Sequence, residues 1–138
     1  MEQLILALLV WLGAHTEYNT AVLLPQIEYK TMREMSDMIY GDTPIENRSE
    51  ILAVYRMKSS TLFLSHDFDV ANKQHQMILV HELTHHLQNK NDVVVACPLL
   101  YEPAAYELMK TWAKENEVLY TGPSEFTIIA RFSQCPDE

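Results

Sequence analysis

The feature that most constrains this chain is an H-E-x-x-H motif, His81-Glu82-Leu83-Thr84-His85, in a segment with helical periodicity. Residues i and i+4 of a helix lie one turn apart on the same face, so His81 and His85 face the same way. Two imidazoles placed like this can bind one Zn²⁺, and the glutamate between them can deprotonate a water that the metal activates. The motif therefore predicts a zinc-dependent hydrolase, and within that class a peptidase, with Glu82 as the general base.

Composition and charge limit the remaining choices. The chain has 138 residues, of which 48% are hydrophobic, which predicts a single domain over residues 1–138 with one core. A net charge of −9 would repel a phosphate backbone, so we expect no nucleic-acid partner. The apolar run from Leu4 to Leu12 is too short to span a membrane, and no basic start or A-x-A cleavage pattern accompanies it. We expect a buried first helix over residues 3–14 and no transmembrane segment, while nothing in the sequence sets an oligomeric state.

Four segments are expected to form strands. Residues 26–30 alternate apolar and polar side chains, which is the period of a half-buried strand. Residues 51–57 and 61–64 flank a short turn and predict a hairpin, and residues 126–132 are rich in strand-forming side chains. The segment 61–64 is either the sheet edge that pairs with an extended peptide or an ordinary hairpin strand, and the sequence leaves both interpretations open.

Two further helices are predicted around the motif helix. Thr31 and Glu34 have the spacing of a capping box for a helix that ends near Tyr40, with its methionines and Ile39 toward the core. The motif helix is expected over residues 70–89, with one buried stripe of leucines at i, i+4 and i+8. Another helix follows over residues 101–117. The stripe consists of Leu79, Leu83 and Leu87.

The identity of a third ligand follows from the helical period after the motif. A catalytic zinc usually has three protein ligands and leaves one position for water. Glu102 shares a helix face with apolar side chains, where a carboxylate is costly unless it meets a cation or a metal. Glu107 shares a face with lysines and is expected to be solvated. We predict Glu102 as the ligand, with a simple helix N-terminal carboxylate as the alternative. Cys97 as a thiolate ligand stays open, although pairing with Cys135 explains it better.

The segment 81–88, followed by Cys97-Pro98 and then by residues 102–106, resembles a group of small, largely uncharacterised bacterial zincin-like proteins. Their helix reads H-E-L-x-H-H-L-Q, and C-P and E-x-x-A-Y follow it. The resemblance extends from Trp11 to Cys135-Pro136 and covers nearly the whole chain. It implies an α+β, minimal zincin-like fold, with a small sheet packed on the motif helix, flanking helices, and an edge strand over the metal.

The E-x-x-A spacing is also similar to the glutamate-zincins, or gluzincins, in which the first glutamate binds the metal. That group usually has an aspartate four residues after the ligand to support a histidine, whereas this chain has Tyr106 there. Tyr106, Tyr101 and His86 are therefore candidates for supporting a ligand or stabilising the transition state. They are chosen by sequence proximity alone.

Partners and compartment follow from the same hypothesis. A peptide or protein is the expected substrate. Two cysteines, Cys97 and Cys135, form either one disulfide or two buried thiols. A bridge would pin the helix over residues 101–117 to the tail and would favour a periplasmic or secreted location. The competing hypothesis is a non-catalytic zinc-containing binding module of the same fold. Structural zinc sites usually have four protein ligands, which favours the catalytic interpretation here.

Overall fold

The central element of the fold is helix α3 (Lys73–Lys90), which carries the H-E-x-x-H motif. The computed structural model describes residues 1–136. The side chain of Asn72 caps α3 by accepting hydrogen bonds from two backbone N–H groups, so the helix begins three residues later than predicted. The predicted leucine stripe is confirmed, because Leu79, Leu83 and Leu87 are all fully buried. The motif therefore lies in the interior of the protein.

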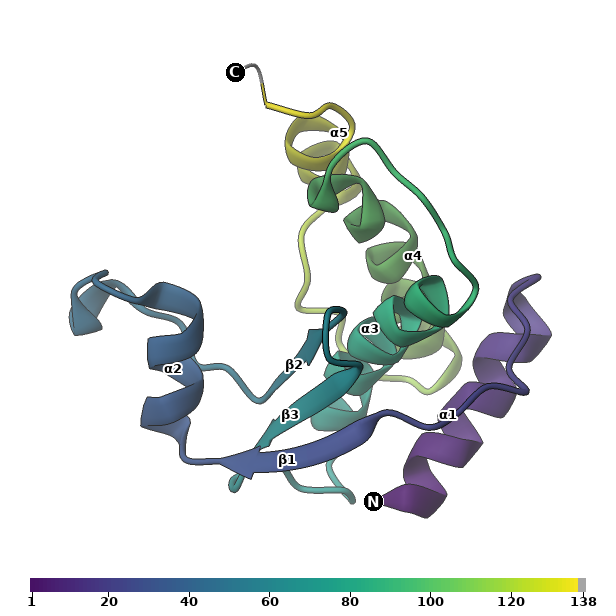
Figure 1. Ribbon diagram of the computed structural model, residues 1–138, viewed down its shortest axis with the longest axis horizontal. Helices are drawn as coiled ribbons and strands as arrows, with labels where there is room; N and C mark the ends of the chain where they lie inside the picture. Colours follow the sequence, from purple (N-terminus) through teal and green to yellow (C-terminus); the bar gives the residue numbers. More distant parts are fainter. Residues whose placement is uncertain (137–138) are drawn as a thin grey trace.

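The sheet has three strands, β1 (Gln26–Lys30), β2 (Ala53–Arg56) and β3 (Thr61–Ser65), in the order β1-β3-β2 (Figure 1). β2 and β3 form the predicted hairpin, and β1 adds to β3 in parallel. Every residue of β3 is buried. The interpretation of segment 61–64 as a sheet edge is therefore wrong, because a paired strand flanks it on each side and leaves it no free edge. The two edges are β1 and β2.

β1 has the predicted bounds but not the predicted burial. Its first four side chains are exposed, and only Lys30 is partly buried. The reason is its position, since α3 packs against β2 and the far edge of the sheet is left to β1. The alternation of apolar and polar residues correctly predicted an extended backbone over residues 26–30. It could not show that, within residues 1–136, no helix packs over the apolar side chains of this strand to bury them.

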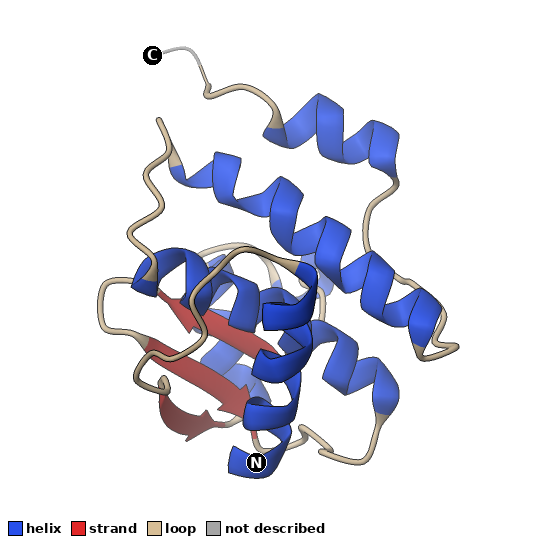
Figure 2. Cartoon of the chain, turned by 90° about the vertical axis from the view of Figure 1, so that its right-hand side faces the viewer, coloured by secondary structure: helices blue, strands red, loops and turns tan. Residues whose placement is uncertain are grey.

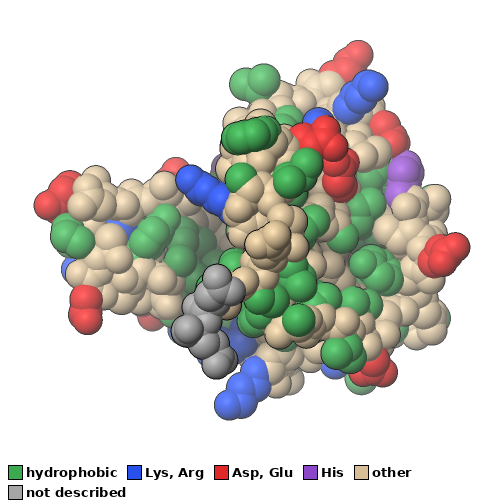
Figure 3. Space-filling view, turned by 90° about the horizontal axis from the view of Figure 1, so that it is seen from above, with side chains coloured by type: hydrophobic (Ala, Val, Ile, Leu, Met, Phe, Trp, Pro, Cys, Tyr) green, Lys and Arg blue, Asp and Glu red, His purple; other side chains and the backbone are tan. Residues whose placement is uncertain are grey.

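Helix α2 (Met32–Tyr40) and the short turn η1 (Ile45–Asn47) project from the body of the protein (Figures 1 and 3). The capping box is confirmed, and Gly41 ends the helix with a φ of 54° that favours glycine. Only one of the predicted core methionines, Met35, is fully buried, and Ile39 is 49% exposed. Residues 31–50 form a protruding unit, the α2 arm, that adds little to the main core.

The first helix, α1 (Glu2–His15), is confirmed and packs along one side of α3. Its inner face is buried, whereas Leu6 and Val10 on the outer face are 45% and 73% exposed. Its burial is thus one-sided rather than complete. The inner residues are Ile5, Leu8, Leu9 and Leu12. Within residues 1–136, no helix has the length and apolar character needed to cross a membrane.

The C-terminal half consists of α4 (Glu102–Glu115) and α5 (Glu125–Phe132), which lie against each other (Figure 2). The predicted strand over residues 126–132 is wrong. Ser124 accepts a hydrogen bond from the backbone of Thr127 and caps a helix, and this helix buries only Ile128, while Phe126 is 82% exposed. Local capping therefore outweighed the strand propensity of the side chains. The whole is an α+β fold, as predicted.

Candidate metal centre

Helices α3 and α4 bring two histidines and one glutamate together at the predicted positions. Nε2 of His81 lies 3.1 Å from Nε2 of His85. The two oxygens of Glu102 lie 3.1 Å from His81 Nε2 and 2.9 Å from His85 Nε2. His81 and His85 are buried and Glu102 is partly buried, with 24% of its side chain exposed. Two imidazole nitrogens and one carboxylate group therefore converge between the helices.

Glu102 lies on the apolar face of α4, as the helical period predicts. Ala105, Met109 and Trp112, which share its face, are buried. Glu107 is exposed, as its neighbouring lysines indicated. Glu102 is the first residue of α4 and follows a 3-10 turn, η2 (Pro98–Tyr101). This short connection sets the carboxylate beside the motif helix.

The donor set fits a small divalent metal. The 2.9–3.1 Å separations, which involve both oxygens of Glu102, are somewhat shorter than the roughly 3.4 Å expected between the ligands of a tetrahedral metal with bonds of about 2.1 Å. Imidazole nitrogens and carboxylate oxygens are ordinary zinc ligands, and one such atom from each of the three side chains lies within 4.8 Å of the other two. His81, His85 and Glu102 can therefore hold a metal ion together.

The short distances among the three side chains shift the pKa values of Glu102 and His85. Burial opposes the ionised form of Glu102, but hydrogen bonds from both histidines outweigh it and lower its pKa to about 2. Burial likewise opposes the charged form of His85, while the contacts with Glu102 and the charge of Glu82 raise its pKa overall. Without a metal, the carboxylate thus stabilises positive charge at this point. A bound cation would take that place.

Glu82 lies beside the three donors without joining them. Its Oε2 accepts a hydrogen bond of 2.9 Å from the backbone N–H of Tyr55, on the edge strand β2. Burial raises the pKa of Glu82, against the lowering effects of His81, His85 and the Tyr55 N–H. The carboxyl of Glu82 is thus buried beside the candidate ligands and is held in place by a backbone N–H.

Gln88 is a buried residue of this centre to which sequence reasoning gave no role. It is 2% exposed, and its Oε1 lies 2.8 Å from Nδ1 of His85. Its position three residues after His85 on the same helix was the available signal. His81 has no such partner, and within residues 1–136 its Nδ1 is the one buried side-chain nitrogen or oxygen without a hydrogen bond.

The three remaining candidates occupy different places. Both ring nitrogens of His86 are engaged, at 2.8 Å from the Tyr55 hydroxyl and at 2.8 Å from the Leu23 carbonyl. The hydroxyl of Tyr101 donates to the Val93 carbonyl. These contacts give His86 and Tyr101 structural roles.

Tyr106 faces the site instead. Its ring centroid lies 4.4 Å from that of His81, and it lines a small hollow with His81 and Glu82. Burial and the nearby charges of Glu102 and Glu82 raise the pKa of Tyr106 to about 12. Its hydroxyl is therefore kept as a donor.

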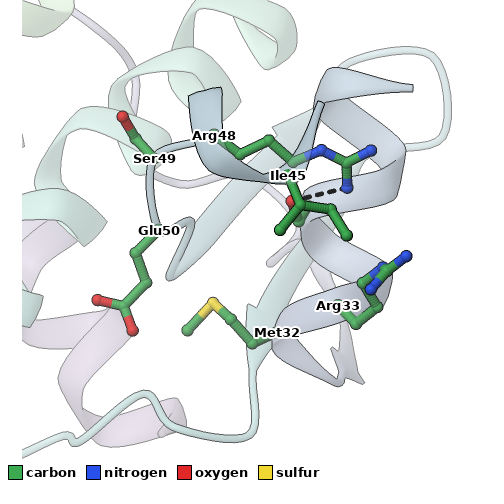
Figure 4. A pocket seen from close by; sticks show the side chains of 7 residues that line it. Met32, Arg33, Ile45, Arg48, Ser49 and Glu50 are labelled. Atoms are coloured by element: carbon green, nitrogen blue, oxygen red, sulfur yellow. Dashed lines mark hydrogen bonds between the residues drawn. The ribbon is translucent and has the colours of Figure 1, made fainter. Parts of the chain in front are cut away.

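Two shallow hollows include residues of the centre: His81 and Glu82 line one, and His85 and Glu102 line the other. One is bounded by Ile78, Tyr106 and Met109, and the other by Tyr55, Met57, Pro98 and Tyr101. A separate hollow lies in the α2 arm and contains none of the candidate ligands (Figure 4). Its labelled lining residues are Met32, Arg33, Ile45, Arg48, Ser49 and Glu50.

Cys97 and Cys135 form a disulfide, with their Cα atoms 5.9 Å apart. Cys97 immediately precedes η2, and Cys135 follows α5, so the bridge ties the approach to Glu102 to the C-terminal tail. The reduced-thiol alternative and the thiolate-ligand alternative for Cys97 therefore do not apply to this structure. The bridge closes a segment with a sequence separation of 38 residues.

Fold and site together define an α+β protein with a two-histidine, one-glutamate candidate metal centre. The chain belongs to the family described as a domain of unknown function, DUF6647, whose sequence profile matches residues 1–137. Comparison with curated proteins and with solved structures finds no match.

Proposed function

We propose that this protein is a zinc-dependent hydrolase of the zincin-like class, acting on peptides or proteins. The observation that carries the proposal is the convergence of His81, His85 and Glu102 with Glu82 beside them but outside the donor triangle. Three protein donors leave one tetrahedral position open, which is typical of catalytic rather than structural zinc sites.

Each side chain has a distinct role in this proposal. Zinc held by His81, His85 and Glu102 would polarise a carbonyl and would lower the pKa of a water to about 7. Glu82 is the group that would take a proton from the attacking water and return it to the leaving amine. The Tyr55 N–H orients the Glu82 carboxyl for both steps. Tyr106, which remains protonated, is placed to donate a hydrogen bond to negative charge that develops on the substrate.

The edge strand supports a peptide as the substrate. β2 is a sheet edge, and Tyr55 and Met57 line the hollow that also contains His85 and Glu102. An extended peptide can pair with such an edge through its backbone. Residues 53–56, rather than residues 61–64, are therefore the strand that would pair with a peptide. The Tyr55 N–H is already bonded to Glu82, so the pairing would use neighbouring groups of the strand.

The disulfide indicates the cellular compartment in which this activity would occur. Disulfides persist in oxidising environments and are rare in the cytosol. The Cys97–Cys135 bridge therefore favours an extracytoplasmic location, periplasmic or secreted.

Metal analysis combined with a peptide-library digest tests the proposal. We expect wild type to bind one Zn²⁺ and to cleave peptides in a chelator-sensitive manner. Glu102→Ala should lose both properties. Glu107→Ala, which removes an exposed carboxylate from the same helix, is the matched control and should retain both.

Two outcomes would redirect the proposal. Zinc binding without cleavage across a broad library would favour the non-catalytic binding module. Full metal content in Glu102→Ala would remove Glu102 from the ligand set.

A further inference from the structure

The side chain of Gln88 connects one ligand of the metal centre to the segment that supplies another. We propose that Gln88 is a positioning residue that sets the tautomer of His85 and holds the approach to Glu102. The inference rests on the proposed metal-binding role of these ligands.

The orientation of the Gln88 amide follows from its partner on η2. Its Nε2 lies 3.0 Å from the backbone carbonyl of Tyr101. A carbonyl oxygen only accepts hydrogen bonds, so the NH₂ end of the amide must point there. The opposite end, Oε1, then faces Nδ1 of His85 at 2.8 Å. The Tyr101 carbonyl thus decides which way the amide lies.

The orientation of the amide in turn decides the state of the imidazole. Oε1 is an acceptor only, so Nδ1 of His85 must carry a proton and donate it. In the neutral ring, Nε2 then has the free lone pair. That atom is the one that faces His81 and Glu102. Gln88 therefore prepares His85 for metal binding through Nε2, and its bond to Nδ1 also fixes the rotation of the ring.

The same side chain fixes the connection between the two ligand helices. Tyr101 directly precedes Glu102, and its hydroxyl donates to the carbonyl of Val93 at 2.8 Å. The N–H of Val93 donates to the backbone carbonyl of Gln88 at 3.0 Å. Gln88, Val93 and Tyr101 thus form a closed ring of hydrogen bonds. The ring ties both ends of the α3–α4 connection to Gln88, whose side chain contacts His85.

Because Gln88 is buried, losing one of its hydrogen bonds should be costly. Gln88 is 2% exposed, so a lost bond would leave a buried polar group without solvent to replace its partner. His81 provides an internal contrast, because its Nδ1 has no partner within residues 1–136. Among the described residues, a protein contact therefore engages Nδ1 of His85 but not Nδ1 of His81.

The test compares two amide-to-leucine substitutions at neighbouring positions of α3. Gln88→Leu removes the bonds to His85 and Tyr101. Asn89→Leu is the matched control, because its Nδ2 bonds to Tyr55, Met57 and Ser60 rather than to a ligand. Zn²⁺ affinity is measured by competition with a chromophoric chelator. We expect Gln88→Leu to weaken it about 10- to 100-fold, and Asn89→Leu to lower stability while leaving affinity near the wild-type value.

A spectroscopic measurement separates positioning from a general loss of packing. In zinc-loaded wild type, the Nδ1–H proton of His85 should give a slowly exchanging NMR signal. Gln88→Leu should lose that signal. Gln88→Glu keeps an acceptor for it but loses the donor to Tyr101, so the signal should persist with an affinity between those of Gln88→Leu and wild type. This variant also decides the matter if Gln88→Leu does not fold.

Wild-type affinity and an unchanged Nδ1–H signal in folded Gln88→Leu would overturn the inference and leave the proposed function intact. Wild-type affinity in Gln88→Glu would overturn the link to Tyr101. Failure of wild type to bind Zn²⁺ would overturn the inference together with the proposed function.

Discussion

Helices α3 and α4, here called the α3–α4 half, can be compared with the α2 arm. Each region contains a capped helix and several charged side chains. The two regions differ in the sequence separation of the residues that their hydrogen bonds join. In the arm, the Arg48 guanidinium bonds to Ser36, Asp37, Gly41 and Thr43, all within 12 residues. In the α3–α4 half, the bonds of Glu82 and His86 join residues 27 and 63 positions apart.

Burial differs in the same direction. α3 buries ten residues, among them His81, Thr84, His85, His86 and Gln88, whereas α2 buries only Met35. The polar groups of α3 depend on one another because they are buried, while those of the arm are largely exposed to solvent. We therefore expect substitutions in the first region to change chemistry and metal binding, and those in the second to change local stability alone.

The largest effect is expected at Glu82, the proposed general base. Glu82→Gln should lower kcat/KM by about 10²- to 10⁴-fold, because the amide cannot accept the proton, while the metal ligands are untouched. Peptide hydrolysis and zinc content are measured on the same sample. Glu107→Gln is the exposed control on α4. Hydrolysis at the wild-type rate in Glu82→Gln would remove Glu82 from the mechanism.

A smaller effect on the reaction is expected at Tyr106. Tyr106→Phe should lower kcat by about 10²-fold with little change in KM, if its hydroxyl donates to charge formed in the transition state. Because the pKa of Tyr106 is raised to about 12, its proton is retained through neutral and moderately alkaline pH, and no activity loss near pH 10 should come from this residue. An unchanged kcat would give Tyr106 a packing role beside His81.

The disulfide should contribute to stability and to the centre together. Replacing Cys97 and Cys135 by serine should lower the free energy of unfolding by about 2–4 kcal/mol, because the open chain gains conformational freedom when unfolded. Zinc affinity should fall as well, since Cys97 precedes the turn that leads to Glu102. Urea denaturation and chelator competition measure the two effects. A stability loss with unchanged affinity would separate the bridge from the metal centre.

The smallest effect is expected in the arm. Arg48→Met should lower the local stability of the arm by about 1–3 kcal/mol and leave zinc affinity unchanged. Hydrogen exchange at the amides of residues 32–48 measures it. Altered zinc affinity in this variant would contradict the separation of the two regions.

The stability loss caused by Arg48→Met should depend on pH. The bond to Arg48 lowers the pKa of Asp37 below 3.8, so its stabilisation is present above that pH and is lost as the pH falls through the lowered value. The difference between wild type and Arg48→Met should therefore shrink in acid. A difference that stays constant would assign the effect to the backbone contacts of Arg48 instead.

Prediction from sequence succeeded where structure depends on neighbours in the chain. The capping box of Thr31 and Glu34, the hairpin of β2 and β3, and the buried leucines of α3 follow from spacings of two to four residues. The same reasoning failed at residues 126–132, because strand-forming side chains there follow a serine cap. It also failed for the burial of β1, where the deciding fact is which strands the helices cover.

The order of residues was sufficient to predict the grouping of His81 and His85, because a helix of known period places them one turn apart. It was also sufficient to prefer Glu102 over Glu107, since the two lie on different faces of α4. It could not reveal that Tyr55 holds Glu82, that Gln88 joins His85 to Tyr101, or that β2 rather than β3 borders the site. Those contacts form between segments whose distance in space is set by the packing of the whole core, and no local spacing encodes that distance.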